Sequence, residues 1–470
     1  MDISYLILMK SEVILSLFIF LLIILKIKEK EANNSLVFDI VNLFLVINFI
    51  IGFFNDCNGI LFSGMYHTNS LIALEKNILN FGVLIISLQA YSWLKDHKHV
   101  IEFYILLLST LLGMFFMISS GNFLLFYLGL ELSTIPLAAL SNFDLEKKKS
   151  SEAAFKLIIS SAFSSAVLLF GISLLYGTTG TLSFTEMQPL IKGTELQLFA
   201  LVIIFSGFAF KLSAVPFHLW TADVYEGSPV AVTAYLSVIS KGAIMFIFIS
   251  ALYTVFQSMV HTWYHILFLS SVLTILIGNL FALRQQNIKR FLAFSTITQA
   301  GYILLGISAN SPMGTASAIY FILVYICSNL GAFGVISLVS AVTGKENIDD
   351  YKGFYTTNPL LSLTLTLSLF SLAGIPPTAG FFGKFFLISA GAASGNYVFI
   401  AIAALNMVVS LYYYLRVVKA IFMDKNTTPI VRLTSPLSMK IALLICVIGI
   451  VFIGLVSHIF EHIYSLSNNL

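Results

Sequence analysis

The chain has little charge for its length. Only 10% of its 470 residues are Asp, Glu, Lys or Arg, whereas a soluble domain carries about 25%. Hydrophobic residues make up 58% of the chain, and the mean hydropathy is +0.95. They form many runs of roughly 20, long enough to cross a ~30 Å hydrocarbon core as helices. The alternation over about ten residues that is typical of membrane strands is absent, so the sequence predicts an all-α polytopic membrane protein.

Cofactor signatures are also missing. The three cysteines, Cys57, Cys327 and Cys446, are far apart and form no CxxC pair. We interpret them as apolar packing residues. The chain has no GxxxxGK phosphate loop, no GxGxxG after a strand and no haem or iron–sulfur cysteine pattern. We therefore expect no cofactor, metal or nucleic acid on this chain, and we expect its chemistry to reside in side chains within the bilayer.

The apolar runs predict about fourteen transmembrane helices, some of them long enough to be tilted or broken. The first run precedes its lysines, which is the wrong order for a cleaved signal peptide, so we expect a retained first helix. The predicted spans are 4–26, 36–55, 71–94, 100–119, 121–141, 152–176, 196–221, 227–256, 262–284, 288–309, 314–343, 358–392, 395–424 and 437–459.

Basic residues are distributed very unevenly between the two sets of connections. One side holds 18 of the 25 Lys and Arg residues, and the other holds only Lys10 and Lys192. By the positive-inside rule the basic side is cytoplasmic, so both termini are expected outside. The 18 residues are Lys26, Lys28, Lys30, Lys95, Lys98, Lys147, Lys148, Lys149, Arg284, Lys289, Arg290, Lys345, Lys352, Arg416, Lys419, Lys425, Arg432 and Lys440.

Five charged residues are predicted within the spans, at membrane depth. They are one acid, Glu131, and four lysines, Lys156, Lys211, Lys241 and Lys384. A charge near a helix centre costs roughly 2.5–3.5 kcal/mol on insertion scales. We therefore expect these groups to face one another, water, or backbone carbonyls freed from helix bonding.

The excess of lysine over acid favours proton transfer. One carboxylate cannot neutralise four ammonium groups, so some lysines should release protons readily, which arginine does not do. The alternative for any one lysine is an ammonium that reaches the interface or forms a structural ion pair. We favour that structural interpretation for Lys76 and Asp39, near the starts of their spans, and it carries more weight for Lys156 than for the other three lysines.

Prolines predict breaks in two of the lysine-bearing spans. Pro216 follows Lys211 by five residues, and Pro376 and Pro377 precede Lys384 by eight and seven. Proline removes a helix hydrogen bond and frees carbonyls. Because the two spans run in opposite directions, we predict two inverted-topology five-helix repeats containing broken helices. The predicted segments are 1–99, a first repeat at 100–256, a second at 257–424, and a C-terminal helix at 425–470.

His218 lies two residues after Pro216, between Lys211 and Lys241 in the sequence. It has two interpretations, a structural group near a helix end or a proton relay, for which the ordinary pKa of histidine is suitable. Asp223 and Glu226 begin the connection to the next span, and we interpret them as helix-capping residues.

Three stretches give a specific resemblance. Residues 210–237 (FKLSAVPFHLWTADVYEGSPVAVTAYLS) closely resemble the N-type membrane subunit of NADH-quinone oxidoreductase, respiratory complex I. The similarity extends through 285–295 (QQNIKRFLAFS) and 373–385 (AGIPPTAGFFGKF), and covers the chain from about span four to span thirteen. Lys384 favours the N type, since the resemblance implies glutamate there in M-type subunits. The chain also lacks the long lateral helix of the L type.

The resemblance implies a role for each charged position. Glu131 would pair with Lys211 and set its protonation, and Lys241 would be the central relay. His218 would lie between the two lysines.

Lys384 would be the exit group toward the outside, and Lys156 would couple to the charges of a neighbouring subunit. Gln299 departs from the pattern, because relatives often have histidine there. Glutamine binds water but does not titrate, which puts a carrier role at that position in doubt.

The resemblance further implies a proton-translocating subunit with no redox centre of its own. The whole complex would use NADH, FMN, iron–sulfur clusters and quinone. Its expected partners are an M-type subunit, small membrane subunits and the lipid bilayer, in the bacterial inner membrane or alternatively the mitochondrial one. The rival interpretations are an Mrp-type cation/proton antiporter subunit, a photosynthetic or hydrogenase relative of complex I, and a structural spacer with static ion pairs.

Overall fold

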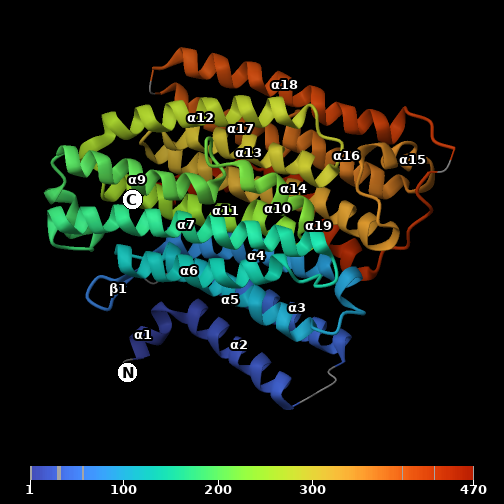
Figure 1. Cartoon of the computed structure of the whole chain (residues 1–470), viewed down its shortest axis with the longest axis horizontal. Helices are drawn as coiled ribbons and strands as arrows, with labels where there is room; N and C mark the ends of the chain where they lie inside the picture. The colour runs from blue at the N-terminus through green and yellow to red at the C-terminus, as the bar shows by residue number, and fades with distance from the viewer. Residues whose placement is uncertain (1–2, 29–32, 55–57, 394, 428, 469–470) are drawn as a thin grey trace. The chain divides into compact units, whose positions relative to one another are not determined.

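The computed structural model describes residues 3–28, 33–54, 58–393, 395–427 and 429–468 (Figure 1). Cys57 and Lys30, to which the sequence analysis refers, lie outside these ranges. The chain divides into two compact units. The first comprises Met1–Leu84, Lys95–Leu212 and Ser240–His265, and the second comprises Ile85–Leu94, Ser213–Ile239 and Ile266–Leu470.

The first unit is helical apart from a short antiparallel hairpin, in which Gly59 pairs with Thr68 and Leu61 with Tyr66. Its elements are α1 (Ile3–Leu8), α2 (Lys10–Lys28), α3 (Asn34–Gly52), β1 (Gly59–Leu61), β2 (Tyr66–Thr68), α5 (Val100–Ile118), α6 (Phe123–Ser141), α7 (Lys148–Thr179), α8 (Phe184–Met187), η1 (Gln188–Leu190), α9 (Glu195–Leu212) and η2 (Gln257–Met259). Three further helices contribute residues to both units, namely α4 (Ser70–Leu94), α11 (Val230–Thr254) and α12 (Val260–Ala282).

Small residues bring α5 and α6 together. A Cβ on Gly129 of α6 would lie 2.7 Å from the backbone nitrogen of Met117 on α5, which is too close for any side chain. Such positions let two membrane helices approach until their backbones touch. α7 packs on α9 and also contacts α6, so these three helices form one packed group.

The second unit is built around α14, whose most apolar window is 94% buried. α13, α16, α17, α19 and α20 all pack against it. The elements of this unit are α10 (Leu219–Gly227), α13 (Ile288–Ile307), α14 (Pro312–Thr343), η3 (Ile348–Tyr351), α15 (Phe354–Thr357), α16 (Pro359–Ala373), α17 (Ala379–Ala392), α18 (Tyr397–Phe422), α19 (Leu437–Leu455) and α20 (Ser457–Ser467).

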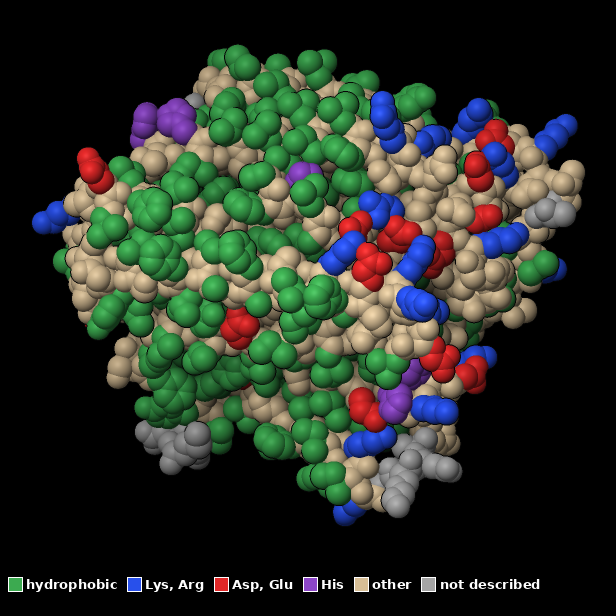
Figure 2. All heavy atoms as spheres, in the orientation of Figure 1, with side chains coloured by type: hydrophobic (Ala, Val, Ile, Leu, Met, Phe, Trp, Pro, Cys, Tyr) green, Lys and Arg blue, Asp and Glu red, His purple; other side chains and the backbone are tan. Residues whose placement is uncertain are grey.

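The predicted fold class, an all-α polytopic membrane protein, is confirmed. Among the described residues, twelve helical segments are long and apolar enough to cross a membrane, and α16 and α17 are shorter apolar helices. The expected total of fourteen crossings stays a prediction. Figure 2 shows many hydrophobic side chains exposed on the face that it presents, as expected where lipid replaces water around the protein. The exposed hydrophobic residues of α7 include Phe155, Ile159 and Phe163.

Candidate functional site

Two interrupted helices carry the candidate site, at the positions where the prolines predict breaks. Six residues separate the end of α9 at Leu212 from the start of α10 at Leu219, and five separate the end of α16 at Ala373 from the start of α17 at Ala379. A helix that ends inside a protein leaves its last carbonyls without intrahelical donors. These carbonyls carry the negative end of the helix dipole, so a cation is favourable beside them.

In the first unit, Lys241 binds the end of α9. Its side chain projects from α11 and is only 5% exposed. Its Nζ donates to the carbonyl oxygen of Leu212 at 3.2 Å, and Leu212 is the last residue of α9. The ammonium therefore supplies a donor to a carbonyl that the break has freed.

In the second unit, Lys384 binds the end of α16. It lies on α17 and is fully buried. Its Nζ donates to the carbonyl oxygens of Leu372 at 2.7 Å and Ala373 at 3.2 Å, and it lies 5.1 Å from the ring centroid of Tyr302. The charged groups at membrane depth were expected to face one another, water or freed carbonyls, and Lys241 and Lys384 bind freed carbonyls.

The second break is tightly closed by a glycine. A Cβ on Gly380, in the first turn of α17, would overlap the carbonyl oxygen of Ser371 near the end of α16. The backbone nitrogen of Gly380 also donates to the hydroxyl of Ser371 at 3.1 Å. No other residue type leaves room for this contact.

Lys211 binds hydroxyl groups. Its Nζ donates to Ser161 of α7 at 2.6 Å and to Thr134 of α6 at 3.1 Å. Glu131 lies one turn before Thr134 on α6 and interacts electrostatically with Lys211. The Oε1 atom of Glu131 is buried and has no hydrogen-bond partner among the described residues. Sequence reasoning predicted the acid and the lysine, but not the two hydroxyls.

Lys156 differs from the other lysines in its exposure. Its side chain is 39% exposed on α7 and pairs with Glu152, one turn earlier, at 2.7 Å. The structure therefore places it at the surface of the first unit, one turn before Ser161, to which Lys211 donates.

His218 occupies the N-cap position of α10 and is buried, in the second unit. The interpretation of Asp223 and Glu226 as capping residues is wrong. Both lie inside α10, where Arg290 Nη1 donates to Asp223 at 2.7 Å and to Glu226 at 2.9 Å. Arg290 thus fastens α10, the helix that begins at His218, to the start of α13.

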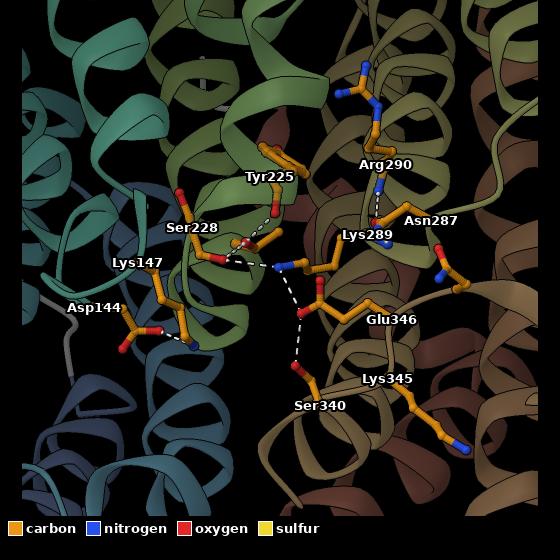
Figure 3. Close-up of polar contacts among 12 residues, drawn as sticks. Asp144, Lys147, Tyr225, Ser228, Asn287, Lys289, Arg290, Ser340, Lys345 and Glu346 are labelled. Carbon is orange, nitrogen blue, oxygen red and sulfur yellow. Dashed lines mark hydrogen bonds and ion pairs between the residues drawn. The ribbon is translucent and has the colours of Figure 1, made fainter. Parts of the chain in front are cut away.

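Lys289 makes a second connection in the same region (Figure 3). Its buried Nζ lies 3.0 Å from Glu346 and donates to the carbonyl oxygen of Ser228, which ends α10, at 3.4 Å. Glu346 also accepts from Ser340 at 2.8 Å, whereas Lys345 points away from this cluster. Sequence reasoning placed Lys289 and Arg290 among the basic connections and missed their contacts with α10.

Gln299 of α13 joins the end of α16, on one side of the second break, to α18. Its Nε2 donates to the carbonyl oxygen of Leu372 at 3.1 Å and to the hydroxyl of Tyr414 at 3.2 Å. Leu372 is the same carbonyl that Lys384 binds. Tyr414 in turn bonds Ser295 at 2.5 Å. Gln299 Oε1 is buried and has no hydrogen-bond partner in the described part of the chain.

A buried ion pair lies elsewhere in the first unit. Lys76 Nζ lies 2.5 Å from Glu12 Oε1 and donates to the hydroxyl of Tyr66 at 3.1 Å. This agrees with the structural interpretation of Lys76, although its partner lies 64 residues away. Asp39 is exposed on α3. Cys327 and Cys446 are buried free thiols. Within the described ranges no group of His, Cys, Asp and Glu could hold a metal ion.

The fold and its broken helices define an antiporter-like, multi-pass membrane protein. The family described as "NADH:quinone oxidoreductase/Mrp antiporter, TM" matches residues 120–410. NADH-quinone oxidoreductase subunit N of Phocaeicola vulgatus is 53% identical over 405 residues, which cover 85% of this chain and 86% of the relative. Subunit N of Pelagibacter ubique is 38% identical over 420 residues, 88% of this chain and 89% of the relative. The chain belongs to the NADH-quinone oxidoreductase subunit N family, so the predicted resemblance is confirmed.

Solved structures agree with this assignment. A chain in the structure of respiratory complex I from Thermus thermophilus with bound aureothin matches with a TM-score of 0.81 at 28% identity, covering 95% of this chain and 97% of that one. A chain in the structure of the Mrp complex from Dietzia sp. has a TM-score of 0.88 at 20% identity, covering 100% and 98%. At that identity the second match shows a shared fold alone.

Proposed function

We propose that this chain is a proton-translocating membrane subunit of a respiratory NADH:quinone oxidoreductase. Electron transfer from NADH to quinone takes place elsewhere in the complex and drives proton movement through Glu131, Lys156, Lys211, His218, Lys241 and Lys384. The observation that carries the proposal is the position of Lys241 and Lys384, each hydrogen-bonded to carbonyls at the end of an interrupted helix.

The two lysines have the chemistry that a relay needs. An amine within the bilayer is costly when charged, but carbonyls at a helix C-terminus favour the charged form. These opposing effects bring the protonated and neutral states closer in free energy, so a nearby change in charge shifts the balance. Arginine, which stays protonated, would not serve this purpose.

The proposal assigns a role in the route to each of these residues. Glu131 controls the charge on Lys211 through space, while Ser161 and Thr134 hold the ammonium in place. Lys241 is the central relay and Lys384 the exit group. Lys156, the most exposed of the four, faces a neighbouring subunit and responds to its charges. His218 passes protons between the lysines at the start of α10.

The proposal includes a setting for the chain. It lies in the bacterial inner membrane beside an M-type subunit and small membrane subunits, with its basic side in the cytoplasm and both termini outside. NADH, FMN, iron–sulfur clusters and quinone are bound by other subunits. The two repeats correspond to residues 100–256 and 257–424, between an N-terminal segment at 1–99 and a C-terminal helix at 425–470.

Lys241→Ala in the assembled complex tests the proposal. In inverted membrane vesicles we expect NADH-driven proton uptake, and quinone reduction coupled to it, to fall by about tenfold or more, as for loss of a proton-transfer group. NADH oxidation by hexaammineruthenium, which needs no proton route, should be unchanged. Lys419→Ala, at an exposed lysine of α18, is the matched control. Full proton uptake in Lys241→Ala would instead support a structural spacer.

The Mrp-like fold makes an antiporter the second candidate. A sodium/proton antiporter would exchange the two ions across vesicles without NADH. If the chain purifies with NADH dehydrogenase activity and its vesicles show no such exchange, the antiporter alternative fails.

A further inference from the structure

A groove of about 760 Å³ lies on the second unit, between α16, α19 and the segment that precedes α19. One end is polar and contains Arg432, Thr434, Ser435 and Lys440. The rest is apolar and is lined by leucines of both helices. No residue of the site described above contributes to it.

Hydrogen bonds hold the polar end of the groove in shape. Asn358, which precedes α16, donates from Nδ2 to the carbonyl oxygen of Val431 at 3.0 Å. Its Oδ1 accepts from the backbone nitrogen of Leu433 at 2.8 Å. Thr357 also donates to the carbonyl oxygen of Ile430 at 2.7 Å. The segment that carries Arg432 is therefore fixed against the start of α16.

The two basic residues of the groove have no acidic partner. Neither Arg432 nor Lys440 forms an ion pair with any carboxylate in the described part of the chain, and both side chains are exposed. Lys352 of the second unit, by contrast, pairs with Asp349 at 2.8 Å. A pair of unpaired cations beside two hydroxyl-bearing residues forms a site for a phosphate group.

The apolar part of the groove has the form of an acyl-chain site. Leu360, Leu363 and Leu367 line it from α16, and Leu444 and Val447 line it from α19. Leu360 is 79% exposed and Leu363 is 51% exposed, although both belong to an apolar helix. Seven helical residues span about 10 Å, so the walls run from the basic end well into the hydrocarbon region.

We propose that this groove binds an anionic phospholipid. The phosphate lies between Arg432 and Lys440, and one acyl chain lies along the leucines of α16 and α19. Both basic residues belong to the side that holds 18 of the 25 Lys and Arg residues, and anionic lipids of the cytoplasmic leaflet attract such residues. A protein partner would instead need acidic groups to match the cations. The proposal goes beyond proton translocation and does not depend on it.

Photolabelling of the purified complex tests this site. The probes are phosphatidylglycerol and phosphatidylcholine, each with a diazirine on an acyl chain, in nanodiscs of otherwise uniform composition. We expect phosphatidylglycerol to label peptides covering 357–367 and 432–447, and phosphatidylcholine to label them far less. Equal labelling by both lipids would overturn the proposal, because it would remove the role of the two cations.

The variant Arg432→Gln/Lys440→Gln tests the cations directly. We expect phosphatidylglycerol labelling of the groove to fall on the order of 30-fold, because the loss of each charge should weaken binding about fivefold. Lys345→Gln/Lys425→Gln is the matched control, since it makes the same charge change outside the groove. Unchanged labelling in the groove variant would overturn the proposal.

A tryptophan in the groove tests the acyl-chain position. Leu363→Trp fills the apolar part, and Leu405→Trp places the same side chain at an exposed position of α18. Only Leu363→Trp should displace the lipid and reduce labelling of the groove by phosphatidylglycerol. If the groove is covered by another subunit instead, Leu363→Trp should release that subunit on native gels and the wild-type groove should take no label. That result would also overturn the proposal.

Discussion

In each unit a lysine donates a hydrogen bond to the end of a broken helix, but the two lysines come from different kinds of helix. In the first unit, the lysine that binds the end of α9 comes from another helix, α11, and its ammonium donates to the carbonyl of Leu212. In the second unit, the lysine comes from α17, the second half of the broken helix itself, and it donates to two carbonyls. A lysine also lies near the end of α9, but Lys211 binds hydroxyls of α6 and α7.

In the second unit, Lys384 has two functions, because it binds the carbonyls at the break and is also the amine at membrane depth. In the first unit these functions belong to two different lysines. In the first unit Lys241 binds the carbonyl, while Lys211 interacts with the acid Glu131. We infer that Lys211 is the group that responds to charge and that Lys241 and Lys384 are the equivalent relay and exit positions.

The largest expected effect is the loss of both donors to the carbonyl of Leu372. In Lys384→Met the carbonyl of Ala373 loses the ammonium, whereas the carbonyl of Leu372 keeps its hydrogen bond from Gln299. In Lys384→Met/Gln299→Leu both carbonyls lose these donors. Each unsatisfied carbonyl costs about 1–3 kcal/mol, so we expect the double variant to be less stable than Lys384→Met by about that amount. Thermal unfolding of the purified complex in detergent measures the difference. Equal stability of the two variants would contradict the role of the shared carbonyl.

The second-largest effect is expected for Arg290→Gln, which tests the contact between α10 and the start of α13. Arg290 is partly exposed, so losing its bonds to Asp223 and Glu226 should cost about 1–3 kcal/mol in total. Hydrogen exchange should increase in residues 219–227. It should stay unchanged in α17, which is held by the separate contact of Gly380 with Ser371. Arg290→Lys keeps the charge but has a shorter side chain without the fixed N–H directions of the guanidinium, and it should restore protection only in part. Faster exchange in both helices would mean that the effect is not local.

The hydroxyls around Lys211 should have a smaller effect. Ser161→Ala and Thr134→Val each remove one hydrogen bond to the ammonium, about 1 kcal/mol. We expect NADH-driven proton uptake to fall by a few fold in each variant, with assembly intact. Ser173→Ala, which removes a hydroxyl that bonds only its own helix on α7, is the control. Normal uptake in the Ser161→Ala/Thr134→Val double variant would show that the hydroxyls do not support Lys211.

The smallest expected effect on stability is that of Lys156→Gln. The pair with Glu152 is exposed and four residues apart on one helix, so it contributes about 0.5 kcal/mol or less. Any large fall in proton uptake in Lys156→Gln therefore reports a role beyond folding. Glu152→Gln breaks the same pair and keeps the lysine. A similar fall in both variants would assign the effect to the pair and not to the ammonium.

The sequence predicts the positions of the breaks well, because proline acts locally. Pro216, Pro376 and Pro377 stand inside apolar runs, and the structure interrupts the helices around them. It also predicts that lysines at membrane depth contact one another, water or freed carbonyls, since an isolated buried charge is costly wherever it lies. The span predicted at 358–392 is two short helices, because the break removes several residues from helical geometry.

The partners of the charged groups could not be predicted. Lys76 and Glu12 are 64 residues apart, and Arg290 and Asp223 are 67 apart. Hydropathy shows that a charge is buried but carries no information about which distant helix lies beside it. The same holds for Gln299, whose contact with Tyr414 spans 115 residues. The adjacent lysine and arginine in QQNIKR mark Arg290 as a basic residue of a connection. Only the structure shows that Arg290 binds Asp223 and Glu226.

Gly380 has a consequence for how a proton would leave the second unit. Its contact with Ser371 has no space for even a methyl group, so α16 and α17 meet there at a fixed angle. Rotation of one helix against the other would need free space between Gly380 and Ser371, and this contact leaves none. In the proposed route, the proton step at Lys384 would therefore proceed by side-chain rotation and rearrangement of hydrogen bonds, while the main chain at the Gly380–Ser371 contact stays in place.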